Sequence, residues 1–136
     1  MKMNPYLSFD GSCEEAFKTY AKVLGGEIVA MLPYKDMPME NNFPPEWGKK
    51  IAHARLIFGD NVLMASDASP ERYKPMEGVS VTLNIPEPAE AERVFDALAD
   101  DGKVDMALDE TFWAHKFGVL VDRFGTRWMV NCEKPR

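Results

Sequence analysis

Residues 4–27 read NPYLSFDGSCEEAFKTYAKVLGGE, and this stretch predicts a strand followed by a helix. The aromatic and apolar residues of 4–9 favour a strand. Ser12 and Glu15 have the spacing of a capping box, in which the Ser12 hydroxyl accepts a hydrogen bond from the Glu15 backbone N–H. The apolar residues that follow share one helical face, at positions 13, 17, 20, 21 and 24. Gly25-Gly26 ends the helix because glycine adopts the left-handed conformation without a steric penalty.

The sequence after this helix predicts three more strands. They are expected at 27–34, 50–58 and 62–66, with a tight turn between the last two. Residues 35–49 contain three prolines, so they cannot form a long regular element and are interpreted as a loop or lid.

The same order of elements returns in the second half. Strand 79–85 alternates in polarity, Pro86-Glu87-Pro88 opens a helix and Asp101-Gly102 ends it. Further strands are expected at 103–108, 115–121 and 126–132. An internal repeat of this size indicates two similar units that bury faces against each other. We therefore predict an α+β fold with two tandem βαβββ modules, at about 1–70 and 76–136. Together they would form a single domain over 1–136, with a curved mixed sheet around a cavity.

The composition narrows the class of protein. The formal net charge of −6 argues against nucleic acid as a partner, since phosphate binding needs a basic surface. Cys13 and Cys132 form no paired motif and are expected to be free thiols in a reducing compartment. No apolar run has the length of a signal peptide or a membrane span. We expect a cytoplasmic protein with no membrane partner.

Short motifs spread over nearly the whole chain resemble one known family. They are Pro5-Tyr6-Leu7, Gly11, Glu15-Ala16-Phe17, Tyr20, Gly25-Gly26, His53-Ala54, Gly59-Asp60, Met64-Ala65-Ser66-Asp67, Phe112-Trp113, Phe117-Gly118, Asp122-Arg123-Phe124-Gly125 and Trp128. Together they resemble the PhnB-like branch of the vicinal oxygen chelate superfamily, which includes glyoxalases, bleomycin-resistance proteins and extradiol dioxygenases. The resemblance implies the two-module fold of that superfamily and a cavity for a small molecule.

The resemblance also implies where a metal would be bound. In metal-using members the ligands are usually His, Gln or Glu on the first and last strands of each module. Here those predicted strands are 4–9, 62–66, 79–85 and 126–132, and none has an interior His or Glu. The usual metal ligand set is therefore absent and no cofactor is assured, although a divalent metal held by other residues stays an alternative. Members of this branch have also been named as methyltransferases of the ubiquinone pathway. No glycine-rich loop of the kind that S-adenosylmethionine binding favours follows the first strand.

His53 is the leading candidate for a catalytic residue. It lies between two alanines that leave room around an imidazole, which can act as base, hydrogen-bond donor or metal ligand. The alternative is a partly buried histidine with satisfied hydrogen bonds. Asp67 is the candidate that orients His53, unless it only caps a turn. His115 is a further candidate, and a metal bound by His53 and His115 would need a third ligand, such as Asp67 or Glu110.

Aromatic and methionine side chains are candidates for ligand contacts. Trp113 offers a flat apolar face and one N–H donor to a cavity, or else anchors a loop to the sheet. Tyr6, Met64 and Phe117 similarly either line the cavity or belong to the core. The predicted ligand-binding residues are Tyr6, Met64, Trp113, His115 and Phe117.

Two functions remain open from the sequence. The first is a small-molecule-binding protein of the bleomycin-resistance kind, which needs a cavity and aromatic walls but no metal. The second is a metal- or histidine-assisted lyase, isomerase or dioxygenase that acts on a small oxygenated substrate. Fold alone does not decide between them. A homodimer is expected in either case, because two-fold pairs are the commonest assemblies.

Overall fold

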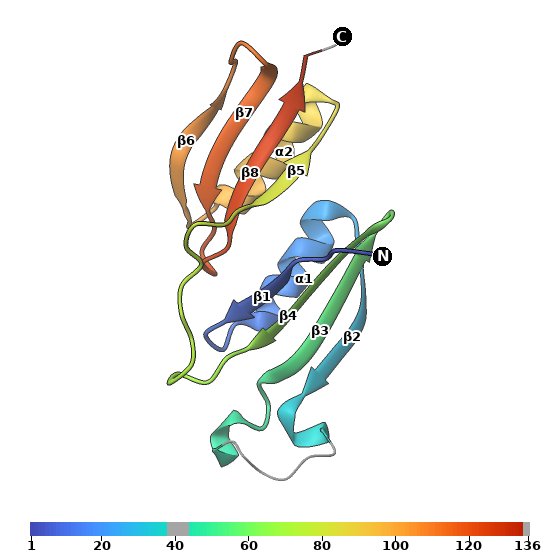
Figure 1. The fold of residues 1–136 in the computed structure, drawn as a ribbon, viewed down its shortest axis with the longest axis vertical. Coiled ribbons are helices and arrows are strands. Elements are labelled where there is room, and N and C mark those ends of the chain that lie inside the picture. Colours follow the sequence, from blue (N-terminus) through green and yellow to red (C-terminus); the bar gives the residue numbers. More distant parts are fainter. Residues whose placement is uncertain (38–43, 135–136) are drawn as a thin grey trace. The chain divides into compact units, whose positions relative to one another are not determined.

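The computed structural model describes residues 1–37 and 44–134, and the chain divides into two compact units, Met1–Lys74 and Pro75–Arg136. The first unit contains β1 (Tyr6–Phe9), α1 (Cys13–Leu24), β2 (Glu27–Pro33), two short 3-10 turns η1 (Tyr34–Asp36) and η2 (Pro45–Trp47), β3 (Ile51–Phe58) and β4 (Asn61–Asp67). The second contains β5 (Val81–Asn84), α2 (Pro88–Ala99), β6 (Lys103–Asp109), β7 (Ala114–Val121) and β8 (Arg127–Glu133). The predicted α+β fold of two βαβββ modules is confirmed (Figure 1).

Each module has its own four-stranded mixed sheet. The strand order is β1-β4-β3-β2 in the first and β5-β8-β7-β6 in the second. In both sheets the first and last strands of the module run parallel, while the other neighbours are antiparallel. The crossover through a helix explains this pattern, because parallel neighbours need a long connection. In each module the helix covers one face of its sheet (Figure 1).

The helix-covered face of the first sheet carries the core of that module. Alternating residues of β1, β3 and β4 point to this face and are buried: Leu7, Phe9, Ala54, Leu56, Leu63 and Ala65. The buried residues of α1 pack against them, and these are Cys13, Ala16, Phe17, Tyr20 and Val23. Phe9, Phe17 and Tyr20 form a cluster of ring contacts, with centroids 6.1–6.4 Å apart. Successive strand residues point to opposite faces. The residues between the buried ones therefore form a second face, which we call the open face.

The N-terminus of α1 corrects one sequence prediction. Ser12 precedes the helix with φ −108° and ψ 15°, and its side chain makes no capping hydrogen bond. The predicted capping box is therefore wrong. The backbone N–H of Cys13 instead donates to the Asp67 carboxylate, 2.9 Å away. Tertiary contact with β4 thus replaces the local cap.

The loop prediction at 35–49 falls partly outside the described residues. The described parts of it form η1 and η2, and residues 38–43 are not described. The lid interpretation therefore stays a prediction.

Close packing in the second module depends on a glycine. A Cβ atom at Gly118 on β7 would lie 2.6 Å from the Phe95 ring of α2 and 3.0 Å from the Leu108 Cα. Both distances are well inside van der Waals contact, and one of them involves backbone that cannot easily move. The sheet and α2 can therefore approach each other only because position 118 has no side chain.

We predict that Gly118→Ala lowers the free energy of unfolding by about 1–3 kcal/mol, the usual cost of overpacking a core. Urea denaturation followed by circular dichroism measures this change. The control is Thr82→Ala on the exposed side of β5 in the same sheet, which is expected to change stability by less than about 0.5 kcal/mol. Equal stabilities of the two variants would contradict the close-packing argument.

Candidate functional site

The open face of the first module brings together three of the predicted site residues. Tyr6 is in register with Met64, and Met64 is in register with Arg55 on the next strand. His53 lies two residues before Arg55, so its side chain points to the same face. Tyr6, Met64 and His53 are thus neighbours, and the partly exposed His53 is not a fully buried core residue.

A hydrogen bond joins the two rings of this cluster. The Tyr6 hydroxyl and His53 Nδ1 are 3.2 Å apart, and the rings are stacked with centroids 5.9 Å apart. When the Tyr6 hydroxyl donates, Nδ1 accepts and the ring proton is on Nε2, because a neutral imidazole carries one N–H. Tyr6 on β1 therefore reaches across β4 and forms a hydrogen bond with Nδ1 of His53 on β3.

Asp67 lies on the opposite face from His53. Ala54 and Ala65 are paired and fully buried, so His53 points away from the helix while Asp67 points toward it. The structure does not bring these two side chains together, which removes the geometric basis for Asp67 orienting His53. The Asp67 carboxylate instead accepts hydrogen bonds from two backbone N–H groups, at Cys13 (2.9 Å) and Ile51 (2.8 Å).

The surroundings of Asp67 are closed to solvent. The residue is 1% exposed, and its backbone oxygen accepts a hydrogen bond of 2.7 Å from the Tyr34 hydroxyl. Burial, and then the neighbouring Asp67 carboxylate, raise the pKa of the Cys13 thiol far above its usual value. The Cys13 thiol therefore stays protonated and is a poor nucleophile.

The open face of the second module carries a row of paired side chains. Asn84 on β5 is in register with Asn131 on β8, and Asn131 is in register with Phe117 on β7. The Asn131 Nδ2 group donates to Asn84 Oδ1 at 3.1 Å. Trp113 contacts Phe117 edge to face, with ring centroids 5.4 Å apart, and is 46% exposed. The predicted residues Trp113 and Phe117 thus lie together beside an amide pair.

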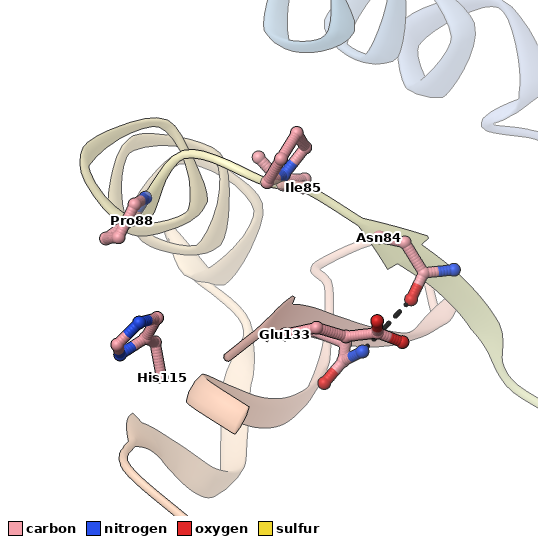
Figure 2. A pocket seen from close by; sticks show the side chains of 7 residues that line it. Asn84, Ile85, Pro88, His115 and Glu133 are labelled. Carbon is pink, nitrogen blue, oxygen red and sulfur yellow. Dashed lines mark hydrogen bonds between the residues drawn. The ribbon is translucent and has the colours of Figure 1, made fainter. Parts of the chain in front are cut away.

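A hollow of about 430 Å³ lies at the end of this row. It is lined by Asn84, Ile85, Pro86, Pro88, His115, Asn131 and Glu133. Figure 2 shows Pro88 and His115 on one side of the hollow, and Asn84 with Glu133 on the other. Two proline rings and an isoleucine supply apolar surface, while the amides, the imidazole and the carboxylate supply polar groups. This mixture of apolar walls and few polar groups is typical of small-molecule sites.

One polar atom at the hollow has no hydrogen-bond partner within the described part of the chain. Asn131 Oδ1 is buried, whereas its Nδ2 is held by Asn84. A buried acceptor without a partner costs about 1–3 kcal/mol. Such a group in a native structure calls for an explanation.

The residues present do not fit the metal site of the superfamily. Over residues 1–37 and 44–134, no group of three His, Cys, Asp or Glu side chains lies close enough to hold a metal ion. His53 is hydrogen-bonded to Tyr6, and both carboxylate oxygens of Asp67 are used by backbone amides on the other face. His115 lies in the other module, at the hollow. No step of a reaction is therefore assigned to a metal.

Sequence reasoning missed several residues of these sites. The sequence predicts that the last strand ends at residue 132, whereas β8 ends at Glu133. Asn84, Asn131 and Arg55 were overlooked because single amides and charges on strands carry no motif. The alternation of buried residues along β8 was the available signal. Asn131 lies between the buried residues Val130 and Cys132, and Glu133 follows Cys132, so both point to the open face.

Comparison with solved structures gives the class of fold. The fosfomycin resistance protein FosX from Listeria monocytogenes matches with a TM-score of 0.68 at 4% identity, over 98% of this chain and 94% of that one. At this identity the match concerns the fold alone. The two modules thus have the vicinal oxygen chelate fold shared by glyoxalase, bleomycin-resistance and fosfomycin-resistance proteins.

A family profile described as 3-demethylubiquinone-9 3-methyltransferase matches residues 1–131, and the chain belongs to this PhnB-like family. Protein YjdN from Escherichia coli strain K12 is 38% identical over 147 aligned positions, which cover 100% of this chain and 98% of that protein. Protein PA1353 from Pseudomonas aeruginosa is 50% identical with a TM-score of 0.91, over 99% of both chains. A PhnB protein from Bacillus cereus is 27% identical with a TM-score of 0.81, over 97% of this chain and 99% of that one.

Neither α1 nor α2, the two α-helices in the described part of the chain, is long and apolar enough to cross a membrane.

We predict that Asp67→Asn lowers the free energy of unfolding by about 1.5–3 kcal/mol, because an amide nitrogen would face one of two backbone donors and leave it unpaired. The control is Asp60→Asn in the exposed β3–β4 turn, which is expected to be nearly neutral. Urea denaturation of both variants measures the difference. Stability of Asp67→Asn equal to that of the control would show that the two backbone amides do not depend on this carboxylate.

Proposed function

We propose that this protein binds a small polar organic molecule through its second module, without a metal ion. The observation that carries the proposal is the buried Asn131 Oδ1, which lacks a partner within the described residues and belongs to a side chain lining the hollow. This oxygen is buried, so a ligand N–H or O–H group pairs with it once the Asn131 side chain turns toward the hollow, and the new hydrogen bond removes the cost of leaving the oxygen unpaired.

The walls of the hollow support the same function. Its volume of about 430 Å³ lies in the usual range for small-ligand pockets, roughly 300–1,000 Å³. Ile85, Pro86 and Pro88 provide rigid apolar contacts that lose little conformational freedom on binding. His115 and Glu133 provide polar groups at the rim, and the Trp113–Phe117 pair extends an aromatic surface beside the amide row.

The hydrogen-bonding character of the hollow indicates the kind of ligand. The Glu133 carboxylate accepts only, and Asn131 Oδ1 is a free acceptor among the described residues. A ligand with a hydrogen-bond donor and a compact branched apolar part matches both features. Isobutyramide, isobutylamine and isobutanol share such a part and carry different donors, so they serve as probes.

We predict that at least one of these probes shifts the amide resonances of residues 84–88, 115, 131 and 133 in ¹H–¹⁵N correlation spectra. Asn131→Ala is expected to weaken binding about tenfold, which corresponds to one hydrogen bond of about 1.4 kcal/mol. The matched control is Asn61→Ala, which removes the exposed amide that donates to the Phe58 carbonyl in the first module, 3.1 Å away.

The probe is expected to be recovered chemically unchanged, and a product would favour the enzyme alternative. No shift at the hollow with any of the three probes, or equal affinities of Asn131→Ala and the control, would overturn the proposal.

We further propose that the chain forms a homodimer. Large apolar side chains are exposed in both described modules: Val29 and Leu32 are 48% and 43% exposed in the first, and Met106 and Phe112 are 51% and 90% exposed in the second. Where such side chains gather in one patch, the surface is typical of protein interfaces.

We predict that light scattering at micromolar concentration gives twice the mass of the chain. Phe112→Ser combined with Met106→Ser is expected to shift the equilibrium toward monomer, because it removes exposed apolar contacts. The control is Lys18→Ser on the outer side of α1. A wild-type monomer at this concentration would contradict the proposal.

A further inference from the structure

The open face of the first module has a polar cluster that the proposed function does not use. Five polar residues of the strands alternate with buried residues, so their side chains share this face. They are Tyr6 and Ser8 on β1, His53 and Arg55 on β3, and Ser66 on β4. Register places Ser8 beside Ser66, and Tyr6 and Arg55 on either side of Met64. All five side chains can donate hydrogen bonds at neutral pH, and His53 has one N–H in either tautomer.

Arg55 on β3 supplies a positive charge to this face. Within the described residues its guanidinium makes no ion pair and no hydrogen bond. Among the described strand residues of this face, the acidic residue is Glu27. It lies on the edge strand β2, in register with Ile57 on β3. The chain as a whole has a formal charge of −6, so its average field repels anions. A local attraction for an anion therefore depends on Arg55.

Tyr6 prepares His53 as a donor. When the Tyr6 hydroxyl donates the hydrogen bond of 3.2 Å to His53 Nδ1, the ring proton is on Nε2. The stacked rings, with centroids 5.9 Å apart, restrict rotation of the imidazole. An N–H donor and a guanidinium, two residues apart on one strand, then face the same side. Planar guanidinium with a neighbouring N–H suits carboxylate or phosphate oxygens.

We infer that the open face of the first module binds a compact oxyanion, a carboxylate or phosphate group, through Arg55 and His53, with the serine hydroxyls of Ser8 and Ser66 beside them. Arg55 provides the charge and bidentate donors. His53 is a binding residue, and Tyr6 is a positioning residue that acts through it. This site is separate in sequence and in module from the hollow at Asn131.

The test uses inorganic phosphate and sodium acetate as probes, titrated at constant ionic strength with the full chain. ¹H–¹⁵N spectra are expected to show saturable shifts at Tyr6, Ser8, His53, Ser66 and the Arg55 side-chain Nε–H. Arg55→Gln is expected to weaken the tighter-binding probe at least tenfold, while Arg55→Lys retains part of the affinity. The matched control is Arg93→Gln on α2, whose exposed guanidinium pairs with Glu90.

Tyr6→Phe separates positioning from plain structural support. It is expected to weaken binding severalfold and to change the ¹⁵N shifts of the His53 ring from the Nε2–H pattern to a mixture of tautomers. Equal loss in Arg55→Gln and Arg93→Gln would mean general charge attraction and would overturn the inference, as would the absence of saturable shifts. Unchanged ring shifts in Tyr6→Phe would remove the role of Tyr6. Asn131→Ala is expected to leave phosphate and acetate binding unchanged.

Discussion

The first module depends on one buried carboxylate. Asp67, the last residue of β4, accepts hydrogen bonds from the backbone N–H of Cys13, where α1 begins, and of Ile51, where β3 begins. A single side chain therefore fastens the helix and two strands at the same end of the module. Charged acceptors form stronger hydrogen bonds than neutral ones. These two hydrogen bonds to the Asp67 carboxylate replace the hydrogen bonds to water that the buried groups have lost. The Tyr34 hydroxyl adds a bond to the Asp67 carbonyl, so the segment after β2 is tied to the same point.

The second module has its own buried carboxylate, at a different place. Asp122 follows β7 and accepts from the backbone of Phe124 and Thr126 and from Trp128 Nε1, the last at 2.8 Å. It shapes the turn that joins β7 to β8 and fixes the large buried Trp128 side chain. Both aspartates thus serve the helix-covered side or the turn, where polar groups must be satisfied internally. The polar side chains of the open faces do not need partners within the protein in this way, so they can form hydrogen bonds with ligands.

Much of the fold could be predicted because its signals are local. The helix periodicity and the alternation on the strands depend on neighbours in sequence. The predicted helices and strands accordingly begin and end within about two residues of α1, α2 and β1–β8 in the described part of the chain. The capping box failed because the competing acceptor, Asp67, is 54 residues away from Cys13. The site was predicted in part. Tyr6, His53 and Met64 gather on one face, and Trp113, Phe117 and His115 lie in the other module near the amide row or the hollow. The partners Arg55, Asn84 and Asn131 could not be found, because register decides which strand residues are neighbours and register is a property of the folded sheet.

Strand alternation also explains why one predicted pair cannot work together. His53 and Asp67 carry the residue types of a base and its orienting acid, yet one lies on the open face and the other under α1. The residue that does reach His53 is Tyr6, from a strand that is not its direct neighbour in the sheet. A phenol is a weaker acid than a carboxylic acid, so it orients the imidazole without placing a negative charge beside it. An imidazole held in this way is suited to donate a hydrogen bond. Within the described residues its side-chain hydrogen bond is to Tyr6, whereas the histidine of a Ser-His-Asp arrangement is hydrogen-bonded to a carboxylate. This arrangement supports the proposed binding role of the open face of the first module. The Asn131 oxygen without a partner among the described residues, and the apolar walls of the hollow, support the binding role proposed for the second module.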